Sequence, residues 1–256
     1  MNRIAKIDRV RGLLSFDLWL ASAWQQDRIP DPLPDGPIPL SSAGSGASFL
    51  NHVPSLRLVG FDEAGRGALA GPVTVACVSF ELSRLLSPKG DLRNSILEVY
   101  SDLNDSKRVT VRNRERLYTL ILKEAHSGLG FSSAVEIDRL GIVPACRIAA
   151  FRAYRNLGLS ADLCLFDRGL TLGEGKGGES MPASIQLTRG DARSFHIAAA
   201  SILAKVGRDA IMRALDKRAS DYRFARHKGY GTAAHRVAIR EHGPSRFHRR
   251  TFLHLE

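Results

Sequence analysis

The chain has 256 residues, 44% of them hydrophobic, which is enough to bury the core of one large domain or of one domain with appendages. It carries 37 Lys and Arg residues against 26 Asp and Glu residues, and this net charge of +11 attracts polyanions such as DNA, RNA or anionic lipid. No apolar run is long enough to cross a bilayer, so we expect no membrane-spanning protein. Charge alone also allows a basic protein without a special partner.

The cysteines indicate a reducing compartment, and we expect the cytoplasm. Cys77, Cys146 and Cys164 are odd in number and far apart, and no C-x-x-C occurs. Neither a disulfide framework nor a zinc site is therefore predicted.

The first part of the chain reads as an extension. Residues 1–28 predict a weakly amphipathic surface helix, and Asp8 and Asp17 argue against its being a secretory signal. Residues 29–55 are rich in Pro, Gly and Ser, which is typical of a linker. We expect an N-terminal extension over 1–55 and a folded domain over 56–256.

Within the folded domain, strand-like and helical patterns alternate. Short apolar runs predict strands at 57–61, 73–80, 129–137, 161–167 and 183–188. Helical spacing predicts helices at 111–126, 143–157, 194–218 and 232–243, the first of them capped by Thr110. This order predicts an α/β fold with a mixed sheet covered by helices.

Two acids follow the first predicted strand. Side chains alternate along a regular strand, but where the strand ends and the backbone turns, Asp62 and Glu63 can both reach one cleft. Phosphodiester hydrolysis favours two cations about 4 Å apart, and magnesium prefers oxygen ligands. The alternative is an ordinary acidic surface turn.

The turn after these acids suits a ligand. Gly65 and Gly67 let the backbone approach closely, and Arg66 between them can clamp a phosphate. Exposed N–H groups there could bind a sugar hydroxyl or a phosphate. The turn matches neither the dinucleotide nor the nucleoside-triphosphate motif.

Two further aspartates are candidates for the same edge of the sheet. Asp167 ends an apolar strand, and Asp191 lies just before a long helix. Asp167 could instead start a turn, and Asp191 could simply favour the helix dipole.

Polar residues on that helix and beyond it complete the candidates. Ser201 and Lys205 are four apart on one face, either solvated or in contact with a phosphate. Lys228, Tyr230 and Thr232 lie in a glycine-hinged loop, where an aromatic side chain among basic neighbours suits stacking on a base or sugar. The alternative is a tyrosine packed on its own helix.

The order of these motifs resembles one family. "DEAGRG…AGP", "LNDSK" (103–107), a strand ending in Asp, "GD" before "AAASILAK", "KGYGT…H" and "GPS…HR" followed by Phe closely resemble ribonuclease HII, from about residue 57 to 253. The resemblance implies a ribonuclease H-like fold with a C-terminal helical extension. It also implies an endonuclease that uses Mg²⁺ or Mn²⁺, with two metals in the site. Apart from the resemblance, a monomer is our default expectation.

The resemblance further implies a substrate and residue roles. The substrates would be RNA/DNA hybrids and duplex DNA containing single ribonucleotides, cut 5′ of the ribonucleotide, in ribonucleotide excision repair and DNA replication. The implied metal ligands are Asp62, Glu63, Asp167 and Asp191. The implied substrate contacts are Gly65, Arg66 and Gly67 for the 2′-hydroxyl, Tyr230 for stacking, and Lys107, Ser201 and Lys205 for phosphates.

The sequence departs from the family pattern in places. Arg168 stands where glycine is usual, Ala192 replaces a serine for which Ser194 could compensate, and the loop 168–182 is long. The first 55 residues lie outside the resemblance and are too short for the extra domain of ribonuclease HIII. Two alternatives remain: a junction resolvase-like nuclease and a non-catalytic nucleic-acid binder.

Overall fold

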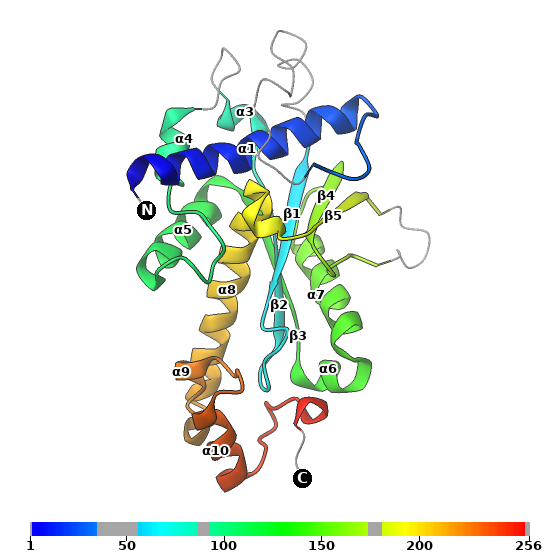
Figure 1. Ribbon diagram of the computed structural model, residues 1–256. Coiled ribbons are helices and arrows are strands. Elements are labelled where there is room, and N and C mark those ends of the chain that lie inside the picture. Colours follow the sequence, from blue (N-terminus) through cyan, green and yellow to red (C-terminus); the bar gives the residue numbers. More distant parts are fainter. Residues whose placement is uncertain (1, 35–55, 87–92, 174–180, 254–256) are drawn as a thin grey trace.

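The computed structural model describes residues 2–34, 56–86, 93–173 and 181–253 (Figure 1). Most of the predicted linker and the centre of the loop 168–182 lie outside the described residues. The strands are β1 (Leu58–Ala64), β2 (Val73–Ser79), β3 (His126–Ser132), β4 (Leu163–Asp167) and β5 (Ala183–Leu187). The helices of the central part are α3 (Leu82–Leu85), α4 (Asn94–Val99), α5 (Val111–Glu124), α6 (Ala134–Leu140), α7 (Ile142–Leu157) and α8 (Phe195–Asp216).

The strands form one mixed sheet in the order β3-β2-β1-β4-β5, which confirms the predicted fold class. β1 pairs antiparallel with β2 and parallel with β4, so it is the central strand. Nearly every residue of β1 and β2 is buried, because helices cover both faces of the sheet. In Figure 1, α8 and α7 lie on opposite sides of these strands.

Small residues let α7 pack closely on the sheet. A Cβ atom on Gly128 would lie 2.0 Å from the carbonyl oxygen of Ala153, and one on Gly130 would lie 2.1 Å from that of Ala149. Backbone therefore packs against backbone there, and any larger residue on β3 would push the helix away.

Two predicted boundaries were wrong. The strand predicted at 129–137 runs from His126 to Ser132, because the Ser133 hydroxyl accepts from the Glu136 N–H while the Glu136 carboxylate accepts from the Ser133 N–H. This reciprocal capping box starts α6. The first strand does not end at residue 61 but continues to Ala64.

The N-terminal helix is present as predicted, over Arg3–Gln25 (α1), but it does not lie loosely at the surface. Leu14, Leu18 and Leu20 are fully buried. Asp17 is also fully buried, and its Oδ2 accepts hydrogen bonds from the His196 N–H (3.0 Å) and from His196 Nδ1 (2.7 Å) on α8. This helix is thus part of the packed core, whereas the sequence alone suggested an appendage.

The C-terminal residues form the expected helical extension beside the end of α8. Its helices are α9 (Phe224–His227) and α10 (Ala233–His242). Phe224 is buried in a small separate core with Met212 of α8 and Ile239 of α10. Among the described helices, none combines the length and apolarity that crossing a membrane requires.

Candidate active site

Asp62 and Glu63 lie inside β1, not after it. They pair with Ala76 and Val75 of β2, so the strand is regular here and the two side chains leave opposite faces. The expectation that the backbone turns at these two acids was therefore wrong, because β2 keeps it extended up to Ala64. Asp62 shares the face of Ala64, which packs in the α8 cluster.

Asp167 is the last residue of β4, directly beside β1. Phe61 and Phe166 are in register in this parallel pair, so Asp62 and Asp167 are the next residues of the two strands. The Asp167 Oδ1 accepts a 2.7 Å hydrogen bond from the Gly190 N–H. This bond fixes the turn Gly190–Ala192, which carries Asp191, against the end of β4.

The charges of the four acids meet around Asp167. Burial raises the pKa of Asp62 well above its usual range, and Glu63 and Asp167 raise it further. Burial also raises the pKa values of Glu63 and Asp191, and in both cases Asp167 adds to the shift. Asp167 thus interacts electrostatically with each of the other three carboxylates, an arrangement of like charges that a bound cation would stabilise.

The donor set fits a divalent ion. The Glu63 Oε2 is buried without a hydrogen-bond partner, and Asp62 is 7% exposed among like charges. Buried carboxylates are costly unless they are paired or bind a metal. The described residues nevertheless contain no group of three such ligands already close enough to hold a metal. Arg66 partly neutralises the cluster, because its Nη1 lies 3.6 Å from the Glu63 Oε1.

The two glycines of the turn after β1 have different reasons to be glycine. Gly65 has φ +89°, and a Cβ there would lie 1.8 Å from the Nε of Arg208. Gly67 is exposed, and a Cβ there would meet no protein atom within 4 Å. The fold therefore requires the first glycine, whereas nothing in the described protein requires the second.

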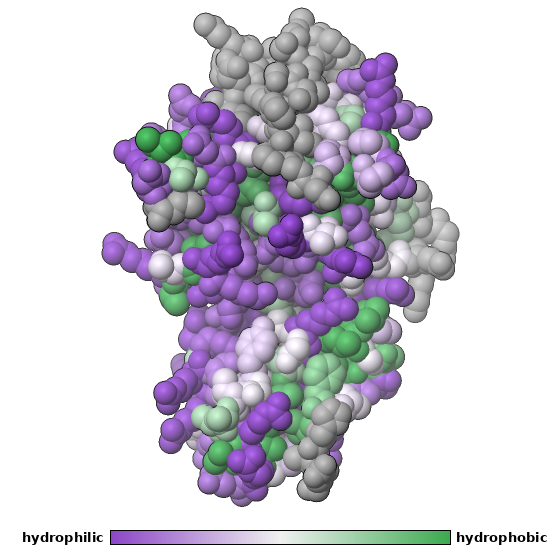
Figure 2. All heavy atoms as spheres, viewed as in Figure 1, coloured by the Kyte–Doolittle hydropathy of each residue, from purple (hydrophilic) through white to green (hydrophobic). Residues whose placement is uncertain are grey.

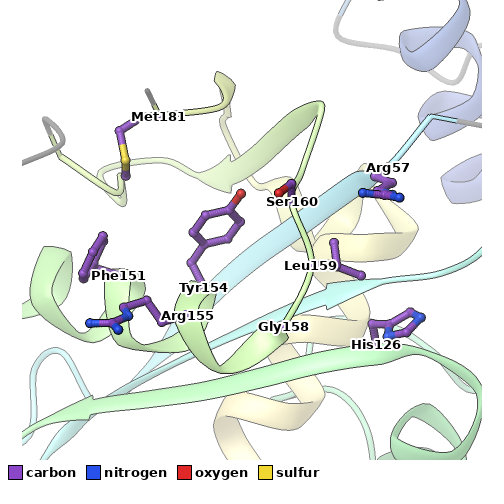
Figure 3. A pocket seen from close by; sticks show the side chains of 9 residues that line it. All are labelled: Arg57, His126, Phe151, Tyr154, Arg155, Gly158, Leu159, Ser160 and Met181. Carbon is purple, nitrogen blue, oxygen red and sulfur yellow. The ribbon is translucent and has the colours of Figure 1, made fainter. Parts of the chain in front are cut away.

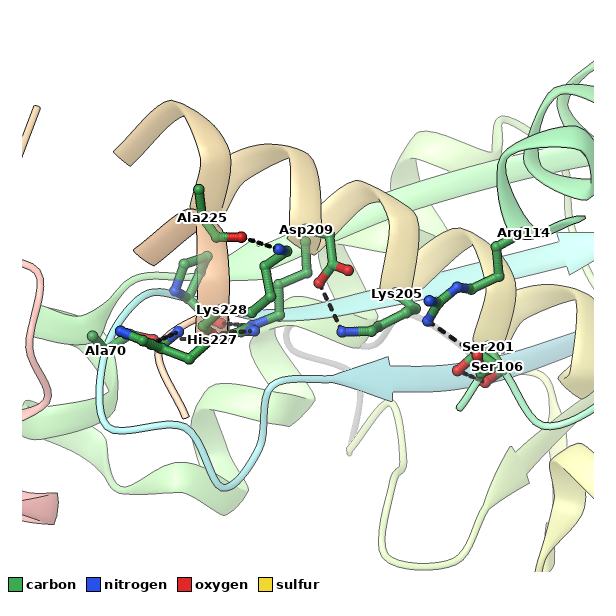
Figure 4. A network of polar contacts seen from close by, with 12 residues as sticks. Ala70, Ser106, Arg114, Ser201, Lys205, Asp209, Ala225, His227 and Lys228 are labelled. Carbon is green, nitrogen blue, oxygen red and sulfur yellow. Dashed lines mark hydrogen bonds and ion pairs between the residues drawn. The ribbon is translucent and has the colours of Figure 1, made fainter. Parts of the chain in front are cut away.

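Two of the predicted phosphate contacts, Ser201 and Lys205, appear in Figure 4 with their polar partners. The Ser201 hydroxyl lies 3.0 Å from that of Ser106, and its hydrogen bond to Asp62 opposes the rise in the pKa of that carboxyl. Lys107 is exposed, and its charge counteracts the rise in the pKa values of Glu63 and Asp191. Both residues therefore lie beside the acid cluster.

Lys205 lies one turn after Ser201 on α8, and Tyr230, from the loop between α9 and α10, lies beside it. The Lys205 Nζ donates to the Asp209 Oδ1 (2.8 Å) and lies 6.0 Å from the centre of the Tyr230 ring. The guanidinium of Arg208 lies over the same ring at 5.3 Å. Tyr230 therefore lies among cations at the end of the site remote from Ser201. Figure 2 shows a largely hydrophilic surface across the middle of this face.

The residues that depart from the family pattern are exposed, whereas the serine suggested as a replacement is buried. Arg168 and Ala192 are both exposed. Ser194 is fully buried, and its hydroxyl accepts from the Ile197 N–H as the N-cap of α8. It therefore cannot supply the contact missing at Ala192, so the suggested compensation was wrong.

Three polar residues beside the predicted site were missed. Arg208 and Arg249 are fully buried arginines whose donors go to backbone carbonyls, and Asp209 forms an ion pair with Lys205. Asp209 could have been found, because it follows Lys205 at helical spacing. The two arginines could not, because a basic residue in a sequence gives no sign of burial.

A separate cavity of about 850 Å³ lies away from the acids, beside Arg57 at the start of β1 (Figure 3). His126, Tyr154 and Arg155 line it with other residues, none of them acidic. It therefore lacks the carboxylate ligands that a magnesium or manganese site requires.

Comparisons with known proteins agree with this arrangement. The sequence matches the model of the family described as ribonuclease HII over residues 59–255. A ribonuclease HII of Chloroflexus aggregans is 46% identical over 196 residues, which cover 76% of this chain and 85% of that protein.

Two solved structures show the same fold at low sequence identity. The ribonuclease H2 of Pyrococcus horikoshii OT3 superposes with a TM-score of 0.59 at 20% identity, covering 77% of this chain and 93% of that one. Bst-RNase HIII in complex with Mn²⁺ gives a TM-score of 0.55 at 16% identity, covering 90% and 75%. With a ribonuclease H-type sheet, four electrostatically linked carboxylates and this sequence match, the chain belongs to the ribonuclease HII family of endoribonucleases.

Proposed function

We propose that the protein hydrolyses the phosphodiester 5′ of a ribonucleotide, in RNA/DNA hybrids and at single ribonucleotides embedded in duplex DNA. The observation that carries this proposal is the position of the Gly65–Gly67 turn directly after the acid-bearing residues of β1. The acids proposed to cleave a phosphodiester and the bare backbone that can meet a sugar hydroxyl are thus two to five residues apart.

The acids account for the cleavage. Asp62, Glu63, Asp167 and Asp191 would hold Mg²⁺ or Mn²⁺, which when bound would polarise the scissile phosphate and lower the pKa of water. The raised pKa values of Asp62, Glu63 and Asp191 support this assignment, because a bound cation would favour their ionised forms. The complex of Bst-RNase HIII, a protein of the same fold, with Mn²⁺ is consistent with it.

The turn accounts for selectivity. Only RNA carries a 2′-hydroxyl, which can both donate and accept hydrogen bonds. Gly67 leaves room for a ribose to approach the backbone, and Arg66 is near enough to exchange its contact with Glu63 for a phosphate. Tyr230, between Lys205 and Arg208, would stack on the neighbouring nucleotide.

The test is a nicking assay on paired duplexes. A DNA duplex with one ribonucleotide, its all-DNA counterpart and an RNA/DNA hybrid are incubated with the protein and Mg²⁺ or Mn²⁺. We expect cuts 5′ of ribonucleotides in the first and third, leaving 3′-hydroxyl and 5′-phosphate ends.

Two outcomes would contradict the proposal. Cutting of branched all-DNA substrates without regard to ribonucleotides would indicate a resolvase-like nuclease. Binding without cleavage in either metal would indicate a non-catalytic nucleic-acid binder. We further propose that the protein acts as a monomer, in ribonucleotide excision repair and replication. We also propose that it acts in the cytoplasm, and its three buried free thiols are consistent with this reducing compartment.

A further inference from the structure

The side chain of Arg249 closes around the turn that follows β1. Its Nη2 donates to the Gly65 oxygen (2.8 Å), its Nη1 to the Arg66 oxygen (2.8 Å) and its Nε to the Gly71 oxygen (3.0 Å). Its own N–H donates to the Leu69 oxygen at 2.8 Å. One residue near the C-terminus thus holds four carbonyls of a loop about 180 positions earlier.

These bonds determine where the amides of the turn point. In a planar trans peptide the C=O and the following N–H point in opposite directions. The carbonyls of Gly65 and Arg66 point inward to Arg249, so the N–H groups of Arg66 and Gly67 point outward. Among the residues that the structure describes, neither N–H has a protein acceptor.

Arg249 differs from Arg208, which is also fully buried, in the carbonyls that it holds. Its guanidinium is fully buried, and in the described part of the chain no carboxylate lies within ion-pair distance of it. Burial of an unpaired charge is unfavourable, and backbone carbonyls compensate it only in part. Arg208 is buried in a similar way, but it bonds the oxygens of Pro72, Ala70 and Lys228 instead of the Gly-Arg-Gly carbonyls.

We propose that Arg249 is a positioning residue that sets selectivity for the 2′-hydroxyl: by turning the Gly65 and Arg66 carbonyls inward, it presents the Arg66 and Gly67 N–H groups to the ribose. This inference rests on the proposed function. It assigns to the protein interior a determinant of selectivity that does not itself touch the substrate. Arg208 serves as the matched control, because it also packs against Gly65 but donates to the carbonyls of Pro72, Ala70 and Lys228 and not to these two.

The experiment measures binding without cleavage. In the Asp62→Asn background, dissociation constants are measured for two duplexes that differ only in one 2′-hydroxyl. Arg249→Lys keeps the charge but loses the planar fork of donors, so one ammonium cannot hold three carbonyls in the same geometry. We expect the preference for the ribonucleotide duplex to fall about tenfold, equivalent to one or two weakened hydrogen bonds. Affinity for the all-DNA duplex should stay unchanged.

The control separates positioning from general destabilisation. Arg208→Lys should weaken binding of both duplexes equally and leave the preference intact. An Arg249→Lys protein that keeps its full preference, or that loses affinity for both duplexes equally, overturns the proposal. The proposed function itself fails if wild type nicks no substrate and the Asp62→Asn protein does not prefer the ribonucleotide duplex. If wild type nicks but Arg249→Lys keeps its preference, only the role of Arg249 fails.

A second measurement does not depend on the folding of any Arg249 variant. In the Asp62→Asn protein, amide hydrogen exchange at Arg66 and Gly67 should be fast when free and slowed by the ribonucleotide duplex but not by its all-DNA counterpart. Slow exchange in the free protein, or equal protection by both duplexes, would contradict the outward orientation of these amides and overturn the proposal.

Discussion

Two buried aspartates contact the same helix and have opposite surroundings. Asp17 of α1 accepts two hydrogen bonds from His196 in the first turn of α8, and the His196 Nε2 in turn accepts from the Phe80 N–H. Asp62 of β1 lies further along α8, beside Ser201, and interacts electrostatically with Glu63 and Asp167. Asp17 thus pairs with a histidine through Oδ2, while its Oδ1 has no partner among the described residues. Asp62 also accepts hydrogen bonds, but its neighbours include two further carboxylates.

The difference separates stability from activity. A buried acid with donors around it stabilises the folded state, whereas one among other acids destabilises it until a cation binds. We therefore expect α1 to contribute to folding and the acid cluster to contribute to chemistry.

Asp62→Asn should reduce nicking by at least about 10³-fold, because a ligand of the proposed cation is lost. Its free energy of unfolding without metal should stay unchanged or rise, since an unfavourable buried charge is removed. Nicking rates and urea denaturation measure the two quantities. A marked loss of stability in this variant would mean that Asp62 is a structural residue like Asp17.

Asp17→Ala should have the reverse effect. It leaves the Nδ1–H and backbone N–H of His196 buried without an acceptor, which we expect to lower the free energy of unfolding by about 2–4 kcal/mol. The nicking rate per folded molecule should change less than about threefold, because Asp17 has no contact with the acid cluster. An Asp17→Ala protein that stays fully stable but loses nicking activity would contradict the structural role assigned to Asp17.

The two glycines of the Gly-Arg-Gly turn give a sharper test within one loop. Gly65→Ala should cost at least about 2 kcal/mol in the free energy of unfolding, because φ is +89° and Arg208 occupies the space. Gly67→Ala should cost less than about 0.5 kcal/mol yet weaken binding of a ribonucleotide duplex. Equal stability of the two variants would contradict the structural role assigned to Gly65.

A buried histidine pair extends the comparison to pH. His196 has a carboxylate partner, but the His248 Nε2 faces the His235 Nε2 at 3.0 Å, and its Nδ1 accepts from the Ser245 N–H. Burial, with His235 adding to it, lowers the pKa of His248 to about 4.

Between about pH 6.5 and 4 the unfolded chain therefore binds more protons than the folded one at this position, and stability falls as the pH drops through that window. We expect His248→Gln to reduce this decline by about 1–2 kcal/mol in urea denaturation between pH 7 and 5. A decline of equal size in wild type and variant would show that His248 does not titrate as described.

Much of the fold follows from the sequence. The apolar runs at 73–80 and 161–167 and the helical spacing at 111–126 gave elements correct to within a few residues, because each element has a pattern of its own. The boundary errors arose where tertiary pairing decides. Pairing with β2 keeps β1 in strand conformation through Asp62 and Glu63. In the sequence, these two acids follow an apolar run, which suggested that the strand ends before them.

The site was less accessible from the sequence. The motifs implied which acids are candidates, but the placement of Asp62 and Glu63 on opposite faces of β1 depends on strand register. Asp17 illustrates the limit: in the sequence it argued only against a signal peptide, whereas in the structure it is a buried partner of a histidine. Arg249 likewise looks like one of many surface arginines until four carbonyls are found around it.

The contact between Asp17 and His196 joins residues that are 179 positions apart, which has a consequence for biosynthesis. At about 5–20 residues per second, a ribosome needs about 10–40 s to make the intervening chain. During that interval the apolar side of the N-terminal helix has no α8 to cover it. The packing of α1 against α8 can therefore form only late in translation, after its contacts with residues 82–103 of the same cluster have become possible.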